Sequence, residues 1–207
     1  MDYEKAFAYV EEQFARHPEH EKKYGYRNRL EHTKRVYMWA KRLLKTEKAD
    51  VEIVLTSVIF HDVGYTISPK DHPSHSANIC REYLEQEGYA QEFIQRVCNH
   101  IMHHRDKEMI YDPNTSIEQI LLIEADCLDE SGVLSMVRDG LEEGLNGACS
   151  YQKVYERMCE RKIFSDDYQY HCVTNTGLKI IKEKQRLYKE LMKSLQYDLF
   201  DEFENEA

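Results

Sequence analysis

The sequence predicts an all-α protein, and two observations lead to that prediction. Apolar side chains recur three or four residues apart over long stretches, as they do on the buried face of an α-helix. Only four prolines and eight glycines interrupt the 207 residues, which favours long helices with few turns. We therefore expect a single domain over residues 1–207, long enough to bury a core.

Three helices are expected in the first third of the chain. The first covers residues 2–16, where aromatic and aliphatic residues follow the helical spacing, and it ends before Pro18. After a charged segment, the second covers residues 30–46. The third, 51–61, is apolar along almost its whole length and has Asp50 as its expected N-cap. Because such a helix has no polar face, we expect it to be buried nearly all round.

The rest of the chain is expected to continue as helices joined by short loops. A loop at 65–72 precedes a helix that begins at Pro73 and ends at Gly88. The C-terminal helices, about 150–198, are expected to pack on the part that carries the motifs, about 28–130. The acidic end is expected to fray. In full, the helices expected in this part of the chain cover residues 73–87, 90–104, 117 through Asp126, 150–160 and 173–198.

Composition limits the classes of partner. The net charge of −10 argues against a nucleic-acid polymer or an anionic membrane as the main partner. The charged N-terminus leads into no apolar signal region, and no apolar stretch approaches the roughly 20 residues that span a bilayer, so a cytoplasmic protein is expected. Six scattered cysteines without a C-x-x-C pair are expected to remain thiols. A monomer and a homodimer both remain open.

The His61-Asp62 pair stands at the end of the apolar third helix, and Gly64 lets the chain turn away just after it. Two further residues with metal-binding side chains, His32 and Asp126, lie in other expected helices. Two imidazoles and two carboxylates form a ligand set suited to a hydrolytic divalent metal. A single His-Asp pair would be weak evidence, but four such residues beside helical patterns predict a metal site.

The order His32, His61-Asp62, Asp126 resembles the motifs of the HD-domain metal-dependent phosphohydrolases. The resemblance runs from about Asn28 to Glu130, and it is closest to the small standalone bacterial members, some of which act on nucleotides. It implies an HD-domain helical bundle, here with a C-terminal helical extension. It also implies a divalent metal and hydrolysis of phosphoester or phosphoanhydride bonds. The implied metal ligands are His32, His61, Asp62 and Asp126.

In this resemblance the catalytic roles fall to Asp62 and His61. A bound divalent metal lowers the pKa of its water and polarises a phosphoryl oxygen, and Asp62 can both ligate the metal and hold the nucleophilic water. Mn, Fe, Co, Ni and Zn all suit the ligand set, and Mg suits an oxygen-rich position near substrate phosphates. No Ser or Cys has the partners that a catalytic triad would need.

Two histidine-rich regions provide candidates for a second metal or for contacts with substrate phosphate. Binuclear members of the family use one histidine from each region. In the first region the family pattern selects His72, with His75 as its rival. In the second it selects His104, with His103 as its rival.

Other candidates lie beside these motifs. Lys70, in the loop after the His-Asp pair, and Arg105, after the histidine cluster, are favoured by position as phosphate-binding cations. Tyr65, just past the metal pair, is a candidate contact for the substrate. Metal-bound histidines usually need a second acceptor for their other ring nitrogen. The candidates for that role are Glu31, Glu124 and Asp129.

Departures from the family patterns narrow the expected substrate. Val63-Gly64-Tyr65 stands where deoxynucleoside monophosphatases place a glutamate and where alarmone hydrolases carry an acidic pair. No Gly-Tyr-Pro motif, typical of the cyclic-di-nucleotide phosphodiesterases, follows His104. The resemblance therefore favours hydrolysis of a small phosphorylated metabolite, above all a nucleotide. Two alternatives stay open, namely a catalytically silent metal- or nucleotide-binding module and a di-iron HD-fold oxygenase.

Overall fold

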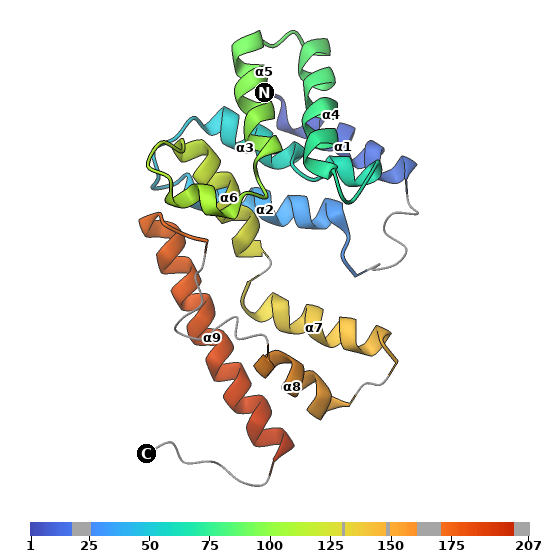
Figure 1. The fold of residues 1–207 in the computed structure, drawn as a ribbon, viewed down its shortest axis with the longest axis vertical. Coiled ribbons are helices and arrows are strands. Elements are labelled where there is room, and N and C mark those ends of the chain that lie inside the picture. The colour runs from blue at the N-terminus through green and yellow to red at the C-terminus, as the bar shows by residue number, and fades with distance from the viewer. Residues whose placement is uncertain (18–25, 130, 148–149, 161–170, 201–207) are drawn as a thin grey trace. The chain divides into compact units, whose positions relative to one another are not determined.

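The computed structural model describes residues 1–17, 26–129, 131–147, 150–160 and 171–200. These residues form helices and connecting loops without a β-strand, so the all-α prediction is confirmed. The chain divides into two compact units (Figure 1). The first contains Met1–Asp129 and His171–Gly177, and the second contains Glu130–Tyr170 and Leu178–Ala207.

The first unit contains six α-helices and two short 3₁₀ helices within its described residues. The order of the α-helices follows the sequence prediction, whereas the two 3₁₀ helices fall partly or wholly in stretches that were expected to be loops. The elements are α1 (Tyr3–Arg16), α2 (Arg29–Leu43), α3 (Val51–Phe60), η3 (Val63–Thr66), α4 (His72–Gln86), α5 (Gln91–Met102), η4 (Lys107–Tyr111) and α6 (Ile117–Asp129).

Side-chain caps fix where the first three helices begin. Asp2 accepts a hydrogen bond from a backbone N–H in the first turn of α1, and Asn28 does the same for α2. Asp50 accepts from the two N–H groups of Glu52 and Ile53, as the sequence predicted. Each cap satisfies a donor that the helix itself leaves without a partner.

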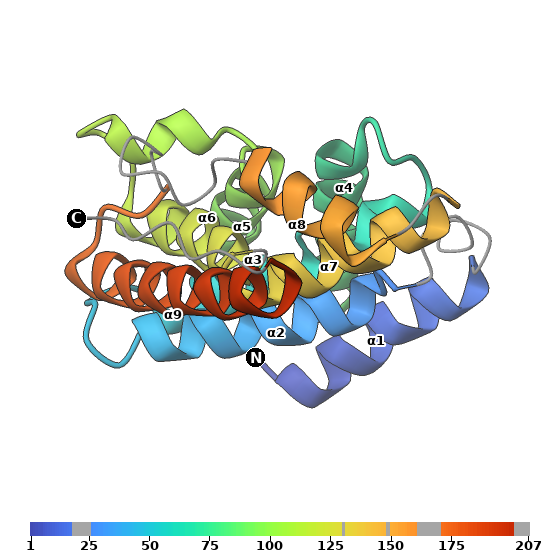
Figure 2. The same cartoon turned by 90° about the horizontal axis from the view of Figure 1, so that it is seen from below.

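Helix α3 is the centre of the first unit. Every residue from Ile53 to Phe60 is buried, and the helix packs against α1, α2, α5 and α6 (Figures 1 and 2). Phe60 lies 5.1 Å from the ring of Tyr83 on α4. Because neighbours surround α3, the residues that follow its last turn have a fixed position. His61 and Asp62 are those residues.

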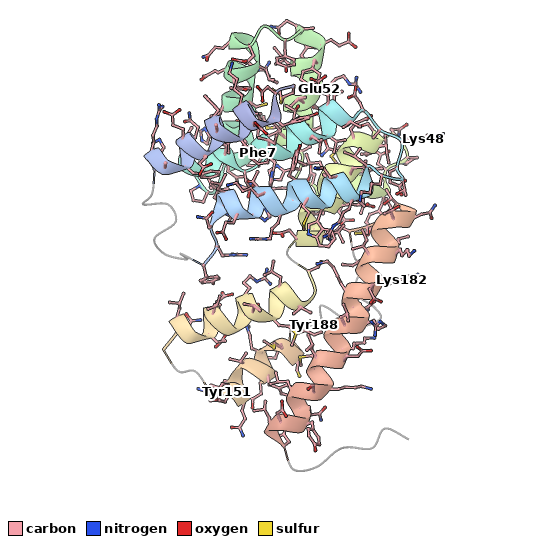
Figure 3. The ribbon with its side chains drawn as sticks, turned by 180° about the vertical axis from the view of Figure 1, so that it is seen from behind. Phe7, Lys48, Glu52, Tyr151, Lys182 and Tyr188 are labelled. Atoms are coloured by element: carbon pink, nitrogen blue, oxygen red, sulfur yellow. The ribbon has the colours of Figure 1, made fainter. Side chains whose placement is uncertain are left out.

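Helix α1 covers α2 and α3 with an aromatic face. Phe7, labelled in Figure 3, makes an edge-to-face contact with Tyr37 of α2 at 5.0 Å between ring centroids. The amino group of Met1 pairs with Glu52 at the start of α3. These contacts tie the first helix to the helices that carry the predicted metal ligands.

A buried carboxylate ties the segment before and at the start of α9 (Asn175–Leu199) to α6. Glu124 is fully buried, and its Oε1 accepts the backbone N–H groups of Val173 and Thr174 at 2.6 and 2.7 Å. Its Oε2 accepts the Thr174 hydroxyl at 2.6 Å. A Cβ at Gly177 would collide with the Glu124 carboxylate, so only glycine allows this close approach. Residues 171–177 are thereby fixed on the helix that carries Asp126.

The second unit contains α7 (Val133–Leu145), α8 (Tyr151–Glu160) and most of α9 (Asn175–Leu199). The sequence analysis expected the last two and missed α7. Gly140 and Gly144 lie inside α7, and glycine in a helix interior costs about 1 kcal/mol relative to alanine, which weakens the sequence signal. Tyr188, labelled in Figure 3, and Ile181 are buried residues of α9.

Two expectations about the C-terminal part remain predictions. The first is that the C-terminal helices pack on the motif-bearing part, and the second is that the acidic tail frays. The frayed acidic tail lies outside the described residues. No helix within the described parts of the chain has the length and apolar character that a membrane span requires.

Replacing Glu124 by alanine should destabilise the protein. The change leaves two backbone N–H groups without their acceptor, at about 1–3 kcal/mol each. We expect a loss of about 2–5 kcal/mol in the free energy of unfolding, measured by urea denaturation. Glu31→Ala, an exposed acid on α2, is the control and should change stability by less than about 0.5 kcal/mol. Equal effects of the two changes would contradict the anchoring role of Glu124.

His100 should make stability depend on pH. Burial lowers the pKa of His100 to about 4, although the charge of Glu118 opposes the shift. The unfolded chain takes up a proton near pH 6.5 and the folded chain only near pH 4, so stability falls as pH drops through this window. Between pH 7 and pH 4, the free energy of unfolding should fall by about 1–3 kcal/mol less in His100→Gln than in the wild type, as measured by denaturant unfolding at several pH values. His103→Gln, which changes a more exposed ring, should show the same change in the free energy of unfolding with pH as the wild type.

Candidate metal centre

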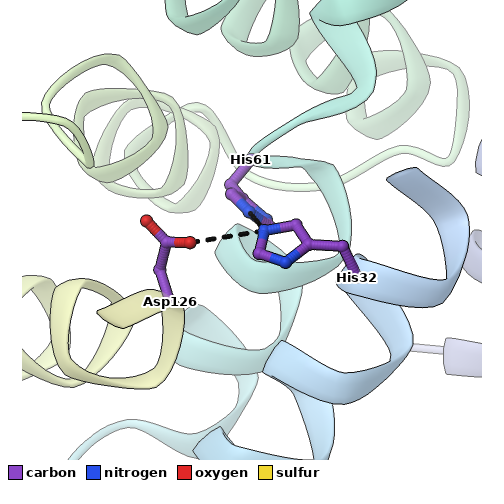
Figure 4. Close-up of side chains that lie close together, drawn as sticks. All are labelled: His32, His61 and Asp126. Atoms are coloured by element: carbon purple, nitrogen blue, oxygen red, sulfur yellow. Dashed lines mark hydrogen bonds and ion pairs between the residues drawn. The ribbon is translucent and has the colours of Figure 1, made fainter. Parts of the chain in front are cut away.

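Three helices bring His32, His61 and Asp126 together, and we name these residues the first cluster (Figure 4). His32 lies in the first turn of α2, His61 caps the C-terminus of α3, and Asp126 projects from α6. The Nε2 atom of His32 lies 3.3 Å from Asp126 Oδ1 and 3.3 Å from His61 Nε2. Residues almost a hundred positions apart therefore meet around one point.

Asp62, His72 and His104 form the second cluster. Asp62 Oδ1 lies 3.2 Å from His72 Nε2 and 3.5 Å from His104 Nε2, and those two nitrogens are 3.2 Å apart. In each cluster one ligand atom from every residue lies within 4.8 Å of the others. The second oxygen, Asp62 Oδ2, is 3.5 Å from His32 Nε2, so this carboxylate lies between the two clusters.

Three of the four cluster histidines have their protonation pattern set by the backbone. The Nδ1 atom of each faces a carbonyl oxygen, which can only accept, so Nδ1 carries the proton and Nε2 of the neutral ring has a lone pair. The acceptors are the carbonyls of Val58 for His61, Pro69 for His72 and Ile101 for His104, at 2.7, 3.0 and 2.7 Å.

The donor set therefore fits a metal ion. Lone pairs on His72 and His104 face each other at 3.2 Å beside the Asp62 carboxylate, which also only accepts. Such an arrangement is repulsive unless a cation or protons lie between the atoms. Imidazole nitrogen and carboxylate oxygen are the ligands that divalent transition metals take in proteins.

A buried acid orients the fourth histidine. Asp129 Oδ2 lies 2.7 Å from His32 Nδ1, and Arg35 binds both Asp129 oxygens at 2.7 and 3.0 Å. A carboxylate behind a metal-bound histidine fixes the ring and strengthens it as a ligand. Of the three acids considered from the sequence, Asp129 makes this contact, whereas Glu31 is exposed and Glu124 anchors residues 173–174.

The pKa values describe the charge of the first cluster. Burial lowers the pKa of His32, but hydrogen bonds with Asp126 and Asp129 outweigh it and raise the pKa to about 10. Burial raises the pKa of Asp126, yet Lys107 and His32 hold it well below its usual range. Burial lowers the pKa of His61 to about 4, so its ring is neutral at pH 7. The cluster thus holds positive charge, which a proton or a metal can supply.

The carboxylate between the clusters, that of Asp62, also has a shifted pKa. Burial raises the pKa of Asp62, but His61, His104 and His72 outweigh it and keep the pKa well below its usual range. Arg29 adds an ion pair to Asp62 Oδ2 at 3.0 Å. Asp62 is therefore ionised and ready to act as a ligand at neutral pH.

Lys107 is the residue that the sequence analysis missed. Its Nζ lies 2.5 Å from Asp126 Oδ2, on the side of the carboxylate away from His32. Lys70 and Arg105, favoured from the sequence, are both exposed. The available signal was the position of Lys107, three residues after His104, but nothing in the sequence showed that η4 turns back toward α6.

Tyr65 is packed on both faces. The Arg29 guanidinium lies 3.8 Å from its ring centroid, and the His72 ring stacks on it at 4.0 Å. Two planar groups this close to one centroid cannot share a face without overlapping, so they lie on opposite sides. Tyr65 therefore has no free face for a nucleobase, and its ring supports Arg29 and His72 instead.

Gly64 has a different role from the one expected. Its φ is not positive, so it is not needed for a left-handed turn. A Cβ at Gly64 would instead collide with the His72 carbonyl and with Ser76, whose Oγ accepts the Gly64 N–H at 2.8 Å. The close approach brings the start of α4 against the turn after α3. This contact places His72 beside Asp62.

The two rival histidines lie outside both clusters. His75 is half-buried on α4, and His103 Nδ1 lies 3.5 Å from Asp106 on a more exposed side. Among the described residues, the metal-type groupings contain His72 and His104 but neither rival.

Fold and site together define an all-helical protein with two His/Asp clusters at the ends of buried helices. Residues 29–131 match the HD domain family. The chain belongs to the HD-domain superfamily, and the resemblance to the HD-domain phosphohydrolases is confirmed at that level. No curated protein gives a significant match to the chain.

Solved structures share the fold. A predicted HD superfamily hydrolase from an uncultured Thermotogales bacterium is 18% identical, with a TM-score of 0.66 over 95% of this chain and 92% of that chain. YpgQ from Bacillus subtilis is 20% identical, with a TM-score of 0.68 over 96% of this chain and 94% of that chain. YpgQ in complex with ADP has a TM-score of 0.61 and 20% identity, over 83% of this chain and 90% of that chain.

Asp129→Asn should weaken metal binding. The amide can still accept from His32 Nδ1 but loses the charge that strengthens the imidazole as a ligand. We expect an affinity for Mn²⁺ about 10- to 100-fold lower, measured by competition with a chelator. Glu31→Gln changes an exposed acid on α2, the helix that carries His32, and should bind Mn²⁺ like the wild type. Unchanged affinity in Asp129→Asn would show that His32 needs no such support.

Proposed function

We propose that this protein is a metal-dependent phosphohydrolase that cleaves a phosphoester or phosphoanhydride bond in a small phosphorylated metabolite, a nucleotide. Membership of the HD superfamily supports the hydrolytic class. The observation that carries the proposal further is the balance of charge around the two clusters.

Each carboxylate at the site has its own basic partner. Asp62 pairs with Arg29, Asp126 with Lys107, and Asp129 with Arg35, at 3.0, 2.5 and 2.7 Å. The cluster imidazoles add no negative charge. The charge of a bound divalent ion is therefore not cancelled by these residues. A net positive centre attracts and stabilises a phosphate anion, whereas a neutral substrate would gain little from it.

The two clusters suggest how metal would be held. His32, His61, Asp126 and Asp62 Oδ2 offer one ligand set, and Asp62 Oδ1, His72 and His104 offer a second. A bound divalent ion supplies a Lewis acid that acidifies water and polarises a phosphoryl oxygen. Mn, Fe, Co, Ni and Zn suit these ligands, and Mg suits oxygen-rich positions near the substrate phosphates.

The protein's own groups would do the remaining work. Asp62 faces both clusters with its two oxygens and accepts a hydrogen bond from the attacking water. The Val58 carbonyl fixes the His61 ring, so its Nε2 needs no reorganisation during the reaction. These two residues are the proposed catalytic pair.

A nucleotide is the proposed substrate class. YpgQ, which shares this fold, forms a complex with ADP. Arg105 is exposed, and its charge acts on Tyr65. Arg105 remains a candidate to contact the outer part of a bound nucleotide. Lys70, in the loop before α4, remains a second candidate. The net charge of −10 disfavours a nucleic-acid polymer as substrate.

The pair of clusters also favours a second candidate, a di-iron oxygenase on the same helices. That activity needs two metal positions, which six residues here could provide. Two irons per chain together with oxygen consumption would support it, whereas release of phosphate or pyrophosphate would not. Metal binding without any reaction would instead support a silent binding module.

Asp62→Ala should abolish hydrolysis. Wild-type protein loaded with Mn²⁺ should release phosphate or pyrophosphate from a panel of nucleotides, and the product names the bond that is cut. Loss of the carboxylate between the clusters should lower kcat by at least about a hundredfold. Metal content measured on the same samples reports one or two ions per chain. Asp71→Ala is the control, because this exposed residue makes no side-chain cap of α4.

A further inference from the structure

Lys107 has unused hydrogen-bonding capacity beside the first cluster. An ammonium group carries three N–H donors. Within the described residues, Asp126 Oδ2 is the only hydrogen-bond acceptor that Nζ reaches, at 2.5 Å. Two donors therefore remain for a ligand.

The two other basic residues at the site, Arg35 and Arg29, make different contacts. Arg35 binds both oxygens of Asp129, which lies behind His32 rather than in a cluster. Arg29 packs its guanidinium against Tyr65 while it pairs with Asp62. Of the three, Lys107 combines direct contact with a cluster carboxylate and a compact charge over which no aromatic ring of the described residues is stacked.

The position of Lys107 allows a ligand to reach it. About a quarter of the side chain is exposed (25%), and its partner Asp126 is itself only partly buried. A lysine side chain ordinarily carries a positive charge at neutral pH. Its contact with Asp126 Oδ2 places that charge beside the first cluster.

The backbone around Lys107 is held in place. The Thr115 hydroxyl donates to the Met109 carbonyl at 2.7 Å, which closes the loop between η4 and α6. Helix η4 packs against α6, the helix of Asp126. A lysine on a fixed element provides a preorganised positive charge instead of one that must be ordered on binding.

We propose that Lys107 binds the phosphate of the substrate, with its two remaining N–H donors directed to phosphate oxygens while Asp126 holds the third. The inference rests on the proposed function and names the residue that recognises the anion. Asp126 contacts Lys107 through Oδ2 and would be one of the residues that hold a metal, so this carboxylate would link the metal and the phosphate.

Inorganic phosphate tests this role without requiring turnover. Binding of phosphate to Mn²⁺-loaded protein would be measured by calorimetry for the wild type, Lys107→Met and Lys107→Arg, with Lys48→Met as the control. Lys48 is an exposed lysine in the loop between α2 and α3, and it has no proposed role at the site. Lys107→Met should bind phosphate about 10- to 100-fold more weakly, as expected for hydrogen bonds to a charged group. Lys107→Arg should recover most of the affinity, and the control should match the wild type.

Metal content separates anion binding from a structural role. It should stay at the wild-type value in Lys107→Met, although the melting temperature should fall because Asp126 loses its ion-pair partner. If the variant instead loses metal in proportion to phosphate affinity, Lys107 only supports Asp126 and the proposal is overturned. Phosphate affinity equal to that of the wild type would also overturn it.

Kinetics distinguish this inference from the proposed function. If the wild type hydrolyses a nucleotide, Lys107→Met should raise KM about tenfold or more with a smaller change in kcat. Hydrolysis with an unchanged KM in Lys107→Met would remove the inference and leave the phosphohydrolase assignment intact. Phosphate binding that depends on Lys107 without hydrolysis of any nucleotide would keep the anion site and remove the assignment.

Discussion

The close approach of acceptor atoms in the two clusters is the constraint on which the rest of the site depends. The Nε2 atoms of His72 and His104 face each other at 3.2 Å, whereas His61 Nε2 lies 3.3 Å from His32, whose raised pKa gives that ring a proton. Acceptors this close repel one another unless positive charge lies among them. The fold must therefore hold them together until a cation binds, which explains how firmly each side chain is fixed.

That fixation comes from backbone carbonyls and from the buried helix α3. Val58 belongs to α3 and orients His61, so the helix places the ligand and also sets its tautomer. Gly64 then allows α4 to approach the turn after α3, and His72 reaches Asp62 as a result. Preorganisation of this kind means that little conformational entropy remains to be lost when metal or substrate binds.

Ion pairs explain how two buried carboxylates, Asp62 and Asp129, coexist with the partly buried Asp126. Arg29, Lys107 and Arg35 each neutralise one acid, which offsets the cost of burying its charge. Under the proposed function, the same pairing would leave the charge of a bound metal to be balanced by an anionic substrate. The burial of these charges and the proposed preference for an anion thus rest on one arrangement.

The sequence by itself determined the helical fold, the Asp50 cap, the burial of α3 and the side chains of the His32, His61, Asp62 and Asp126 set, because these follow from local spacing and from motif order. Only the tertiary structure decided that His72 and His104 join Asp62, that Asp129 supports His32, and that Lys107 contacts Asp126. Helix α7, with its two glycines, also had to come from the structure. The physical reason is that spacing along a helix gives the face on which a residue lies, whereas the partner of that face depends on contacts between elements far apart in the chain.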